Sequence, residues 1–142
     1  LAQWKELELI SSPFLQQYTK QINSENLRKH ANVIAISIGS NIKLEIFLGN
    51  VIQCVDHLPD NIDAWYLDGF DPKKNPAMWN SALFKAIYEK TSYNGTLSTF
   101  TAAGAVRRDL AACGFDMKKI VGYGRKREML YGVKHELQEA LS

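Results

Sequence analysis

DAWYLDGF, residues 63–70, contains a short apolar run, Ala64–Leu67, with an aspartate on each side. Four to eight apolar residues between turn-forming residues are typical of a buried strand. After a loop, apolar residues recur at helical spacing from Trp79 to Ile87. We therefore predict a buried strand over 64–67 and a helix that ends at about Lys90.

The alternation of strand and helix continues after this helix. Residues Thr96–Phe100 are rich in strand-forming types and follow the turn-like pair Asn94–Gly95. Thr101 is placed to cap a further helix that stops at Gly114. One side of that helix carries the apolar residues Ala102, Ala105, Val106 and Leu110.

The chain closes with two strand patterns, residues 115–121 and 128–134, around the turn 122–124. Strands that alternate with helices indicate a parallel sheet, and a tight turn joins antiparallel neighbours. The predicted fold class is therefore α/β, with a parallel sheet that ends in an antiparallel hairpin, one strand of which is inserted near one edge of the sheet.

Upstream of residue 63, the patterns are shorter. A hydroxyl cap and Pro13 predict a helix over residues 13–22. Residues 32–38 and 42–48 alternate as two half-buried strands of a hairpin. Asn50 is placed to cap a short helix that runs to about residue 58.

Length and composition favour one globular domain over residues 1–142. Hydrophobic residues make up 46% and charged residues 23%, which is ordinary for a folded chain. No apolar run approaches the roughly 18 residues that span a bilayer, so no membrane segment is expected. The two cysteines, Cys54 and Cys113, lie far apart and are expected to be free, buried thiols in a reducing compartment, the cytoplasm.

Charge is unevenly divided along the chain. Residues 1–71 carry 5 Lys/Arg and 9 Asp/Glu, whereas residues 72–142 carry 12 Lys/Arg and 6 Asp/Glu. A basic half is compatible with binding to a polyanion such as RNA, and equally with an ordinary solvated surface.

Candidate site residues follow the predicted strands, because ligands of open α/β sheets bind at the carboxyl ends of the strands. Gly49 and Asn50 follow the hairpin, and Asp68, Gly69 and Phe70 come directly after the first buried strand. Thr99, Phe100 and Thr101 lie at the end of the next strand. A carboxylate at this position is costly unless it has a partner or a function. Gly69 permits close approach of a ligand to the backbone, and Phe70 offers a face for stacking. The alternative is that Asp68 begins a turn and Phe70 fills the core.

Residues 68–79, DGFDPKKNPAMW, form a loop whose two prolines favour an extended path across the top of the sheet. Lys73 and Lys74 lie on it, and further cations lie at 107–108 and 125–127. Each cluster suits contacts with phosphate, and each also suits a solvated surface. The predicted fold brings the three clusters to one side.

Metal chemistry and covalent hydrolysis have no support in the sequence. The three histidines, His30, His57 and His135, have neither triad partners nor metal-ligand spacing. We expect them to be structural or exposed, and we expect no metal.

Three blocks identify a resemblance: DAWYLDGFDPKKNPAMW, GTLSTFTAAGAVRRDLAACGF and GYGRKREMLYGV. In this order and spacing they resemble the methyltransferase domain of the MnmC-type tRNA-modifying enzymes, from about Leu44 to Val133. The resemblance implies a class I, Rossmann-like S-adenosylmethionine methyltransferase sheet. It also implies formation of 5-methylaminomethyl-2-thiouridine at the tRNA wobble position, by methylation of 5-aminomethyl-2-thiouridine.

The resemblance implies roles for individual residues. Asp68 and Phe70 would be catalytic: Asp68 would accept hydrogen bonds from the exocyclic amine and help to remove its proton, while Phe70 walls the uridine. The cofactor would be bound by Gly49, Asn50, Asp68 and Gly69, and Asn50 replaces an aspartate that is usual in the family. Contacts to substrate and tRNA would come from Lys73, Lys74, Asn75, Pro76, Trp79, Arg107, Arg108, Arg125, Lys126 and Arg127.

One part of the family pattern is not found in these residues. A glycine-rich turn after a first strand holds the cofactor in this class of enzyme, and the nine glycines form no such turn. The chain also starts at Leu1. We therefore expect the C-terminal portion of a methyltransferase domain, incomplete at its N-terminal side. The FAD-dependent oxidase domain of the family is expected as a fused or separate partner.

Two other functions stay open from the sequence. A degenerate methyltransferase fold could bind tRNA through its basic half without catalysis. A methyltransferase could also act on a small-molecule amine, although the basic half favours tRNA.

Overall fold

The computed structural model describes residues 33–38, 40–69, 71–122, 124 and 127–136. The chain divides into two compact units, residues 1–50 and residues 51–142. Each unit is described here by itself, so the single domain expected over 1–142 stays a prediction. The expected helix over 13–22 and His30 lie outside the described residues.

The first unit contains the expected hairpin. Strands β1 (Val33–Ile38) and β2 (Ile42–Phe47) pair antiparallel, with Val33 opposite Phe47 and Ile38 opposite Ile42. The expectation of a half-buried face is wrong for most of its positions, since Ile42 and Leu44 are exposed. Among the described residues, this unit holds only the hairpin and no second layer that could bury one face of it.

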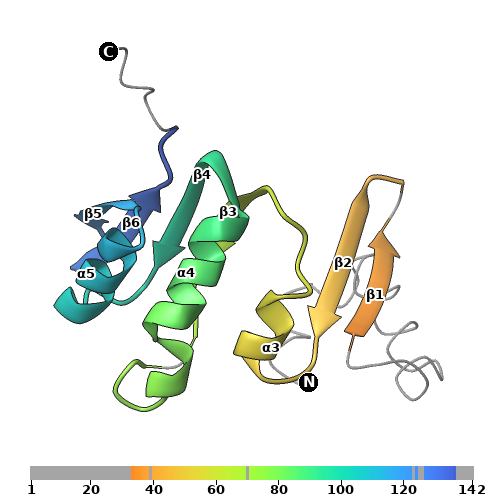
Figure 1. Ribbon diagram of the computed structural model, residues 1–142, viewed down its shortest axis with the longest axis horizontal. Helices are drawn as coiled ribbons and strands as arrows, with labels where there is room; N and C mark the ends of the chain where they lie inside the picture. Colours follow the sequence, from red (N-terminus) through yellow and green to blue (C-terminus); the bar gives the residue numbers. More distant parts are fainter. Residues whose placement is uncertain (1–32, 39, 70, 123, 125–126, 137–142) are drawn as a thin grey trace. The chain divides into compact units, whose positions relative to one another are not determined.

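The second unit alternates helices and strands, as the sequence predicts (Figure 1). In chain order its elements are α3 (Val51–Val55), β3 (Ile62–Tyr66), the 3-10 helix η3 (Pro76–Met78), α4 (Ser81–Lys90), β4 (Thr91–Thr99), α5 (Gly104–Ala112), β5 (Asp116–Val121) and β6 (Glu128–Val133). The α3 helix is shorter than expected, and a turn with a bond from the Leu58 N–H to the Val55 carbonyl continues it.

The sheet of the second unit has the strand order β3-β4-β6-β5 among the described residues. β3 pairs parallel to β4, with Trp65 opposite Leu97. β6 runs antiparallel to both its neighbours, with Leu130 opposite Thr99 on one side and Lys119 on the other. This is the predicted parallel sheet with a terminal antiparallel hairpin.

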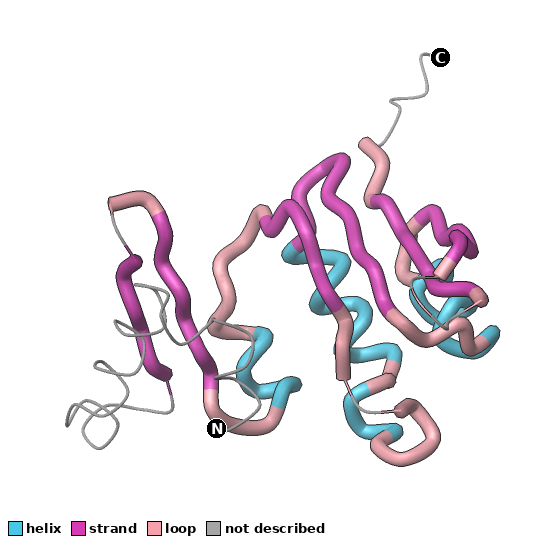
Figure 2. The backbone as a smooth tube through the Cα atoms, turned by 180° about the vertical axis from the view of Figure 1, so that it is seen from behind, coloured by secondary structure: helices cyan, strands magenta, loops and turns pink. Residues whose placement is uncertain are grey.

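Both longer helices, α4 and α5, cover the same face of this sheet (Figures 1 and 2). The core lies between them and the sheet, and each partner contributes fully buried side chains. Its largest are Phe84 from α4, Leu110 from α5, Leu97 from β4 and Leu130 from β6. Their alternation with half-buried neighbours in the strands is the period of two that one covered face requires.

Two predictions for the strands are wrong in detail. The run Ala64–Leu67 is not buried, and Tyr66 is 81% exposed. The reason is that β3 lies at an edge, with Tyr66 on the face that α4 and α5 leave uncovered. Asn94–Gly95 is not a turn but lies inside β4, where the pairing with β3 shifts register. Asn94 does have the left-handed φ of a turn residue, at 62°.

The predicted start of the last helix is also wrong. Ala103, rather than Thr101, is the N-cap residue of α5, and its side chain makes no capping bond. The Thr101 hydroxyl instead accepts a hydrogen bond from the Ala103 N–H at 3.2 Å, before the helix begins. Val106 and Leu110 form the buried side of the helix as expected.

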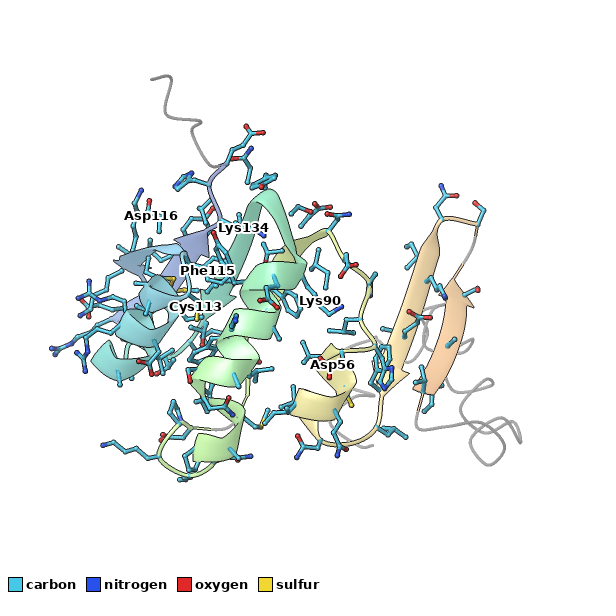
Figure 3. The ribbon with its side chains drawn as sticks, viewed as in Figure 1. Asp56, Lys90, Cys113, Phe115, Asp116 and Lys134 are labelled. Atoms are coloured by element: carbon cyan, nitrogen blue, oxygen red, sulfur yellow. The ribbon has the colours of Figure 1, made fainter. Side chains whose placement is uncertain are left out.

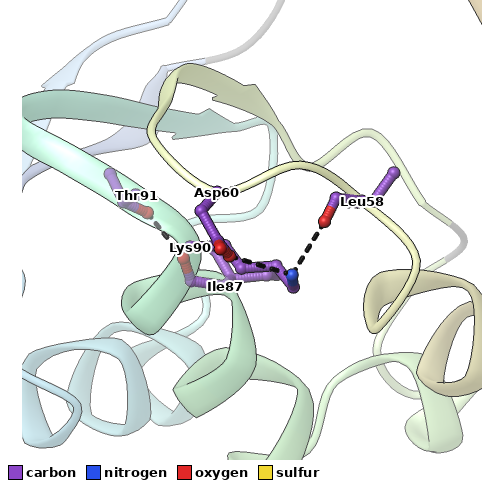
Figure 4. Close-up of polar contacts among 5 residues, drawn as sticks. All are labelled: Leu58, Asp60, Ile87, Lys90 and Thr91. Atoms are coloured by element: carbon purple, nitrogen blue, oxygen red, sulfur yellow. Dashed lines mark hydrogen bonds and ion pairs between the residues drawn. The ribbon is translucent and has the colours of Figure 1, made fainter.

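A dense hydrogen-bond network stabilises the end of the sheet at which strands β3 and β4 begin. The Trp65 indole donates to the Thr91 hydroxyl at 3.0 Å, and that hydroxyl donates to the Ile87 carbonyl at 2.6 Å. Lys90 donates to the Leu58 carbonyl at 2.8 Å and contacts the Asp60 carboxylate at 3.2 Å (Figure 4).

Lys134, at the end of β6, completes this network beside the junction of α4 and β4 (Figure 3). Its ammonium donates to the Tyr88 carbonyl at 2.9 Å and to the Thr91 carbonyl at 2.8 Å. It also lies 4.6 Å from the centre of the Tyr88 ring. The last carbonyls of α4 thereby receive the cation that a helix C-terminus favours.

The cysteines are free thiols, as predicted, but both are half-buried. Burial raises the pKa of the Cys113 thiol, and the nearby Asp109 carboxylate raises it further.

Candidate functional site

A cavity of about 330 Å³ lies at the edge where the parallel strands β3 and β4 end. The residues that follow β3 form one wall, and the residues that follow β4 form another. Glu128, the first residue of β6, completes it. The lining consists of Leu67, Asp68, Gly69, Asp71, Pro72, Trp79, Thr99, Phe100, Thr101, Ala102 and Glu128.

Asp68 is exposed and lines this cavity, two residues beyond the end of β3. The Leu67 N–H donates to the Ser98 carbonyl at 2.9 Å, which continues the parallel pairing up to the residue before Asp68. Within the described residues, no hydrogen bond or ion pair engages the Asp68 carboxylate. The carboxylate is therefore available to a ligand.

A second cavity, of about 250 Å³, shares Asp68 with the first. It lies on the uncovered face of the sheet, because Tyr66, Ser98 and Met129 project from that face. Its wall is almost entirely apolar, and Phe100 lines it as well as the larger cavity. The two cavities therefore meet at Asp68 and Phe100.

The loop from Asp71 to Trp79 is compact, so the prediction of an extended loop is wrong. The Asp71 carboxylate accepts from the Lys73 N–H at 2.9 Å, and its carbonyl accepts from the N–H groups of Lys74 and Asn75. This turn leads into η3, with Pro76 in its first turn. The prolines fix turns here, because the preceding aspartate supplies local acceptors.

Trp79 ends this loop and lines the cavity while it also packs on the core. Its ring meets Phe84 edge to face, with ring centres 6.4 Å apart. The Asn80 side chain accepts from the Leu83 N–H at 2.9 Å and so caps α4 directly after Trp79. The rigid helix start therefore positions the tryptophan.

Gly69 is approached by side chains of this loop. A Cβ atom at Gly69 would lie 3.2 Å from the Met78 methyl carbon and 3.6 Å from the Trp79 ring. The glycine therefore permits Met78 to pack closely. Its expected contact with a cofactor stays a prediction.

Glu128 also lines the cavity, although no role for it is predicted from the sequence. Its carboxylate accepts from the Lys119 ammonium at 2.7 Å, across the β5–β6 pair. The pairing of β6 with β4 brings Glu128 to the cavity. Because β6 is antiparallel to β4, β6 begins where β4 ends. The sequence predicts an antiparallel strand near one edge of the sheet, but not the register that brings Glu128 to the cavity.

The predicted cations that the structure describes do not line either cavity. Lys73 and Lys74 are exposed on the loop, Arg107 and Arg108 are exposed on α5, and Arg127 is exposed before β6. None of these side chains, nor Asn75 or Pro76, lines a cavity. Among the described residues, the lining of the larger cavity contains three carboxylates and no Lys, Arg or His.

Several predicted residues are not placed together with this site. Phe70, Arg125 and Lys126 lie outside the described residues. Gly49 and Asn50 are exposed at the end of the first unit, which is described separately. Their roles stay predictions.

In the part of the chain that the structure describes, no group of three or more His, Cys, Asp or Glu side chains could hold a metal ion. Over the same residues, no helix has the length and apolarity to cross a membrane. His57 and His135 are both exposed, and His135 lies 3.2 Å from the Asp116 carboxylate.

Comparison with known proteins places this site in a family. A family model described as S-adenosyl-L-methionine-dependent methyltransferase matches residues 13–135. A crystal structure of MnmC2 from Aquifex aeolicus is similar to the chain, with a TM-score of 0.61 and 26% identity, over 68% of this chain and 32% of that one.

Curated relatives are more similar in sequence. The tRNA 5-methylaminomethyl-2-thiouridine biosynthesis bifunctional protein MnmC of Stutzerimonas stutzeri is 42% identical, over 93% of this chain and 19% of the relative. The protein of the same name from Pseudomonas paraeruginosa is 44% identical over the same shares. The chain thus spans about a fifth of the length of these relatives.

Proposed function

Because the chain belongs to the S-adenosyl-L-methionine-dependent methyltransferase family, we propose that it methylates the exocyclic amine of a tRNA wobble uridine. The product would be 5-methylaminomethyl-2-thiouridine, and the substrate 5-aminomethyl-2-thiouridine. The names of the relatives support this choice of substrate. The observation that carries the proposal is the Asp68 carboxylate, exposed in a cavity at the carboxyl edge of the sheet with no partner among the described residues.

Asp68 acts on the amine. A primary amine is mostly protonated at neutral pH, and its lone pair is then not available for methyl transfer. The carboxylate accepts a hydrogen bond from the ammonium and takes its proton as the nitrogen becomes a nucleophile. It also fixes the direction of the nitrogen, which supports an in-line displacement.

S-adenosylmethionine supplies the electrophilic methyl group on a sulfonium when it is bound. The described residues suit part of such a molecule, since the cavity combines apolar side chains such as Leu67 and Trp79 with carboxylates that complement a cation. We assign a cofactor-binding role to Asp68 and Gly69, and the family resemblance implies the same role for Gly49 and Asn50.

The exposed cations lie outside the cavities and suit the phosphates of tRNA. Lys73, Lys74, Arg107, Arg108 and Arg127 contact the backbone in this proposal, which places the charged polymer on the surface and only one base in the cavity. Phe70 walls the base, and Arg125 and Lys126 extend the basic surface. An FAD-dependent oxidase as partner and a cytoplasmic location follow from the same assignment.

The test uses the natural protein that contains this chain, with tRNA that carries 5-aminomethyl-2-thiouridine. We expect Asp68→Asn and Asp68→Ala to lower kcat by about 10²–10⁴-fold, the usual contribution of a general base. The affinity for tRNA should change by less than about twofold, because phosphate contacts dominate it. Asp56→Asn is the matched control, since Asp56 is an exposed aspartate outside both cavities.

Three outcomes would contradict the proposal. Wild-type protein that binds tRNA but neither binds S-adenosylmethionine in calorimetry nor transfers a methyl group would be a binding module. Full turnover by Asp68→Ala would assign the proton transfer to another group. Methylation of a free amine with no effect of tRNA would indicate a small-molecule substrate.

A further inference from the structure

Phe100 is an exposed aromatic side chain at the point where the two cavities meet. It follows directly after β4, and 45% of it is exposed, whereas Thr99 before it is 3% exposed and Leu97 is 1% exposed. Burial of such a side chain is worth about 1.5–3 kcal/mol. Phe100 therefore does not contribute its full burial free energy to stability, and it lines the same cavities as Asp68.

The backbone around Phe100 is fixed, so its exposed position is built into the fold. The Thr101 N–H donates to the buried Thr99 hydroxyl at 3.3 Å. The Thr101 hydroxyl in turn accepts from the Ala103 N–H at 3.2 Å. These two bonds bracket Phe100 between the end of β4 and the start of α5.

The lining of the larger cavity indicates what this side chain contacts. Phe100 and Trp79 are the two aromatic residues among the described residues of the lining, and Trp79 is held by its edge-to-face contact with Phe84. The charged groups that the described residues contribute to the lining are the carboxylates of Asp68, Asp71 and Glu128. Such a wall favours a flat ring that bears a cationic amine, and it disfavours phosphate.

We infer that Phe100 contacts the planar ring of the methyl acceptor and selects a heteroaromatic base that bears an amine. The inference rests on the proposed function and deepens it. Stacking of a base on an aromatic side chain is worth about 1–3 kcal/mol, and every base has a face for it. Asp68 then meets the amine on the substituent while Phe100 holds the ring.

The test measures methyl transfer by the natural protein to an anticodon stem-loop that carries 5-aminomethyl-2-thiouridine. We expect Phe100→Leu to raise KM by about 5–150-fold, the equivalent of that stacking energy. Phe100→Tyr should retain a KM within about threefold of wild type, because it keeps the ring. The affinity for S-adenosylmethionine and the melting temperature should stay unchanged, which a merely structural role would not allow.

Tyr93→Leu is the matched control, since Tyr93 is an aromatic residue of β4 that is 55% exposed and lies outside both cavities. Phe100→Trp provides a direct readout. Its added fluorescence should be quenched by the stem-loop with the modified base, and much less by the same stem-loop with its wobble base removed.

The inference is overturned if Phe100→Leu has the KM and kcat of wild type, or if Phe100→Trp fluorescence does not respond to the base. If Phe100→Leu does not fold, the fluorescence of Phe100→Trp decides. Lack of any methylation by the wild-type protein would contradict the proposed function instead, so the two failures are distinguishable.

Discussion

The four-stranded sheet of the second unit has two ends, one where β3 and β4 begin and one where they end, and each is called an edge here. The two edges differ in how their polar groups are used. At the edge where β3 and β4 begin, the polar side chains of Trp65, Thr91 and Lys134 are paired within the fold. At the edge where these strands end, Asp68 has no partner among the described residues, and two cavities open. The first edge holds the sheet and helices in place, so that the second can expose groups to a ligand.

Substitution of alanine for Gly95 and for Gly69 tests this difference, because the two glycines lie toward opposite edges of the sheet. The quantity compared is the loss in free energy of unfolding. A Cβ atom at Gly95 would lie 2.6 Å from a Thr91 methyl, 2.8 Å from the Ser92 carbonyl and 3.0 Å from the Ile62 carbonyl. Backbone atoms cannot move aside, so we expect Gly95→Ala to lower the free energy of unfolding by about 3 kcal/mol. Chemical denaturation of the chain measures it.

At Gly69 the nearest atom is the flexible end of Met78, at 3.2 Å. Gly69→Ala should therefore cost less than about 1 kcal/mol of stability. Equal losses at the two glycines would show that the two edges are equally constrained, against our interpretation.

Lys134→Met removes the cation that joins β6 to the end of α4. The Tyr88 and Thr91 carbonyls then lose their charged donor, and a hydrogen bond to a charged group contributes about 1.5–3 kcal/mol. We expect a loss of about 2 kcal/mol in the same denaturation experiment. Lys85→Met is the control, because Lys85 is exposed and its ion pair with Glu89 is long, at 3.8 Å. A loss no larger than that of the control would contradict the role of Lys134.

The smallest effect is expected at Asp116, beside the held edge. A hydrogen bond from His135, and then one from Lys118, hold the pKa of the Asp116 carboxyl below its ordinary value of 3.8. A carboxyl with a lowered folded-state pKa stabilises the protein above its unfolded pKa and loses that contribution as the pH falls through the folded one. Melting temperature against pH should therefore fall less steeply below about pH 4 in Asp116→Asn than in wild type. Identical curves for Asp116→Asn and wild type would show that protonation of Asp116 does not affect stability.

Periodicity in the sequence predicts the covered core but not its exceptions. The alternation around Leu97 and the helical spacing around Leu110 are local patterns, and both residues are buried as such patterns require. Asn94 and Gly95 also carry a genuine local signal, a left-handed φ and a crowded glycine. An Asn-Gly pair is compatible with a turn and with a register shift inside a strand. The pairing of β4 with β3 shows that it is a register shift here.

The candidate site was predictable where it lies next to a strand in the sequence. Asp68 was found because the carboxyl ends of parallel strands meet at one edge. Glu128 joins it only through the order β3-β4-β6-β5, which depends on contacts between distant segments. The cations were expected nearby because phosphate chemistry suggested it, but their exposed positions on the loop, on α5 and before β6 keep them outside the cavity.

The pairing of Leu130 with Thr99 has a consequence for the composition of the cavity wall. Side chains alternate between the faces of a strand, so Glu128 and Leu130 project to the same side. A slip of β6 by one residue would expel Leu130 from the interior and turn the Glu128 carboxylate away at the same time. Burial of Leu130 therefore fixes the register of β6, and the same register keeps the Glu128 carboxylate in the wall of the cavity.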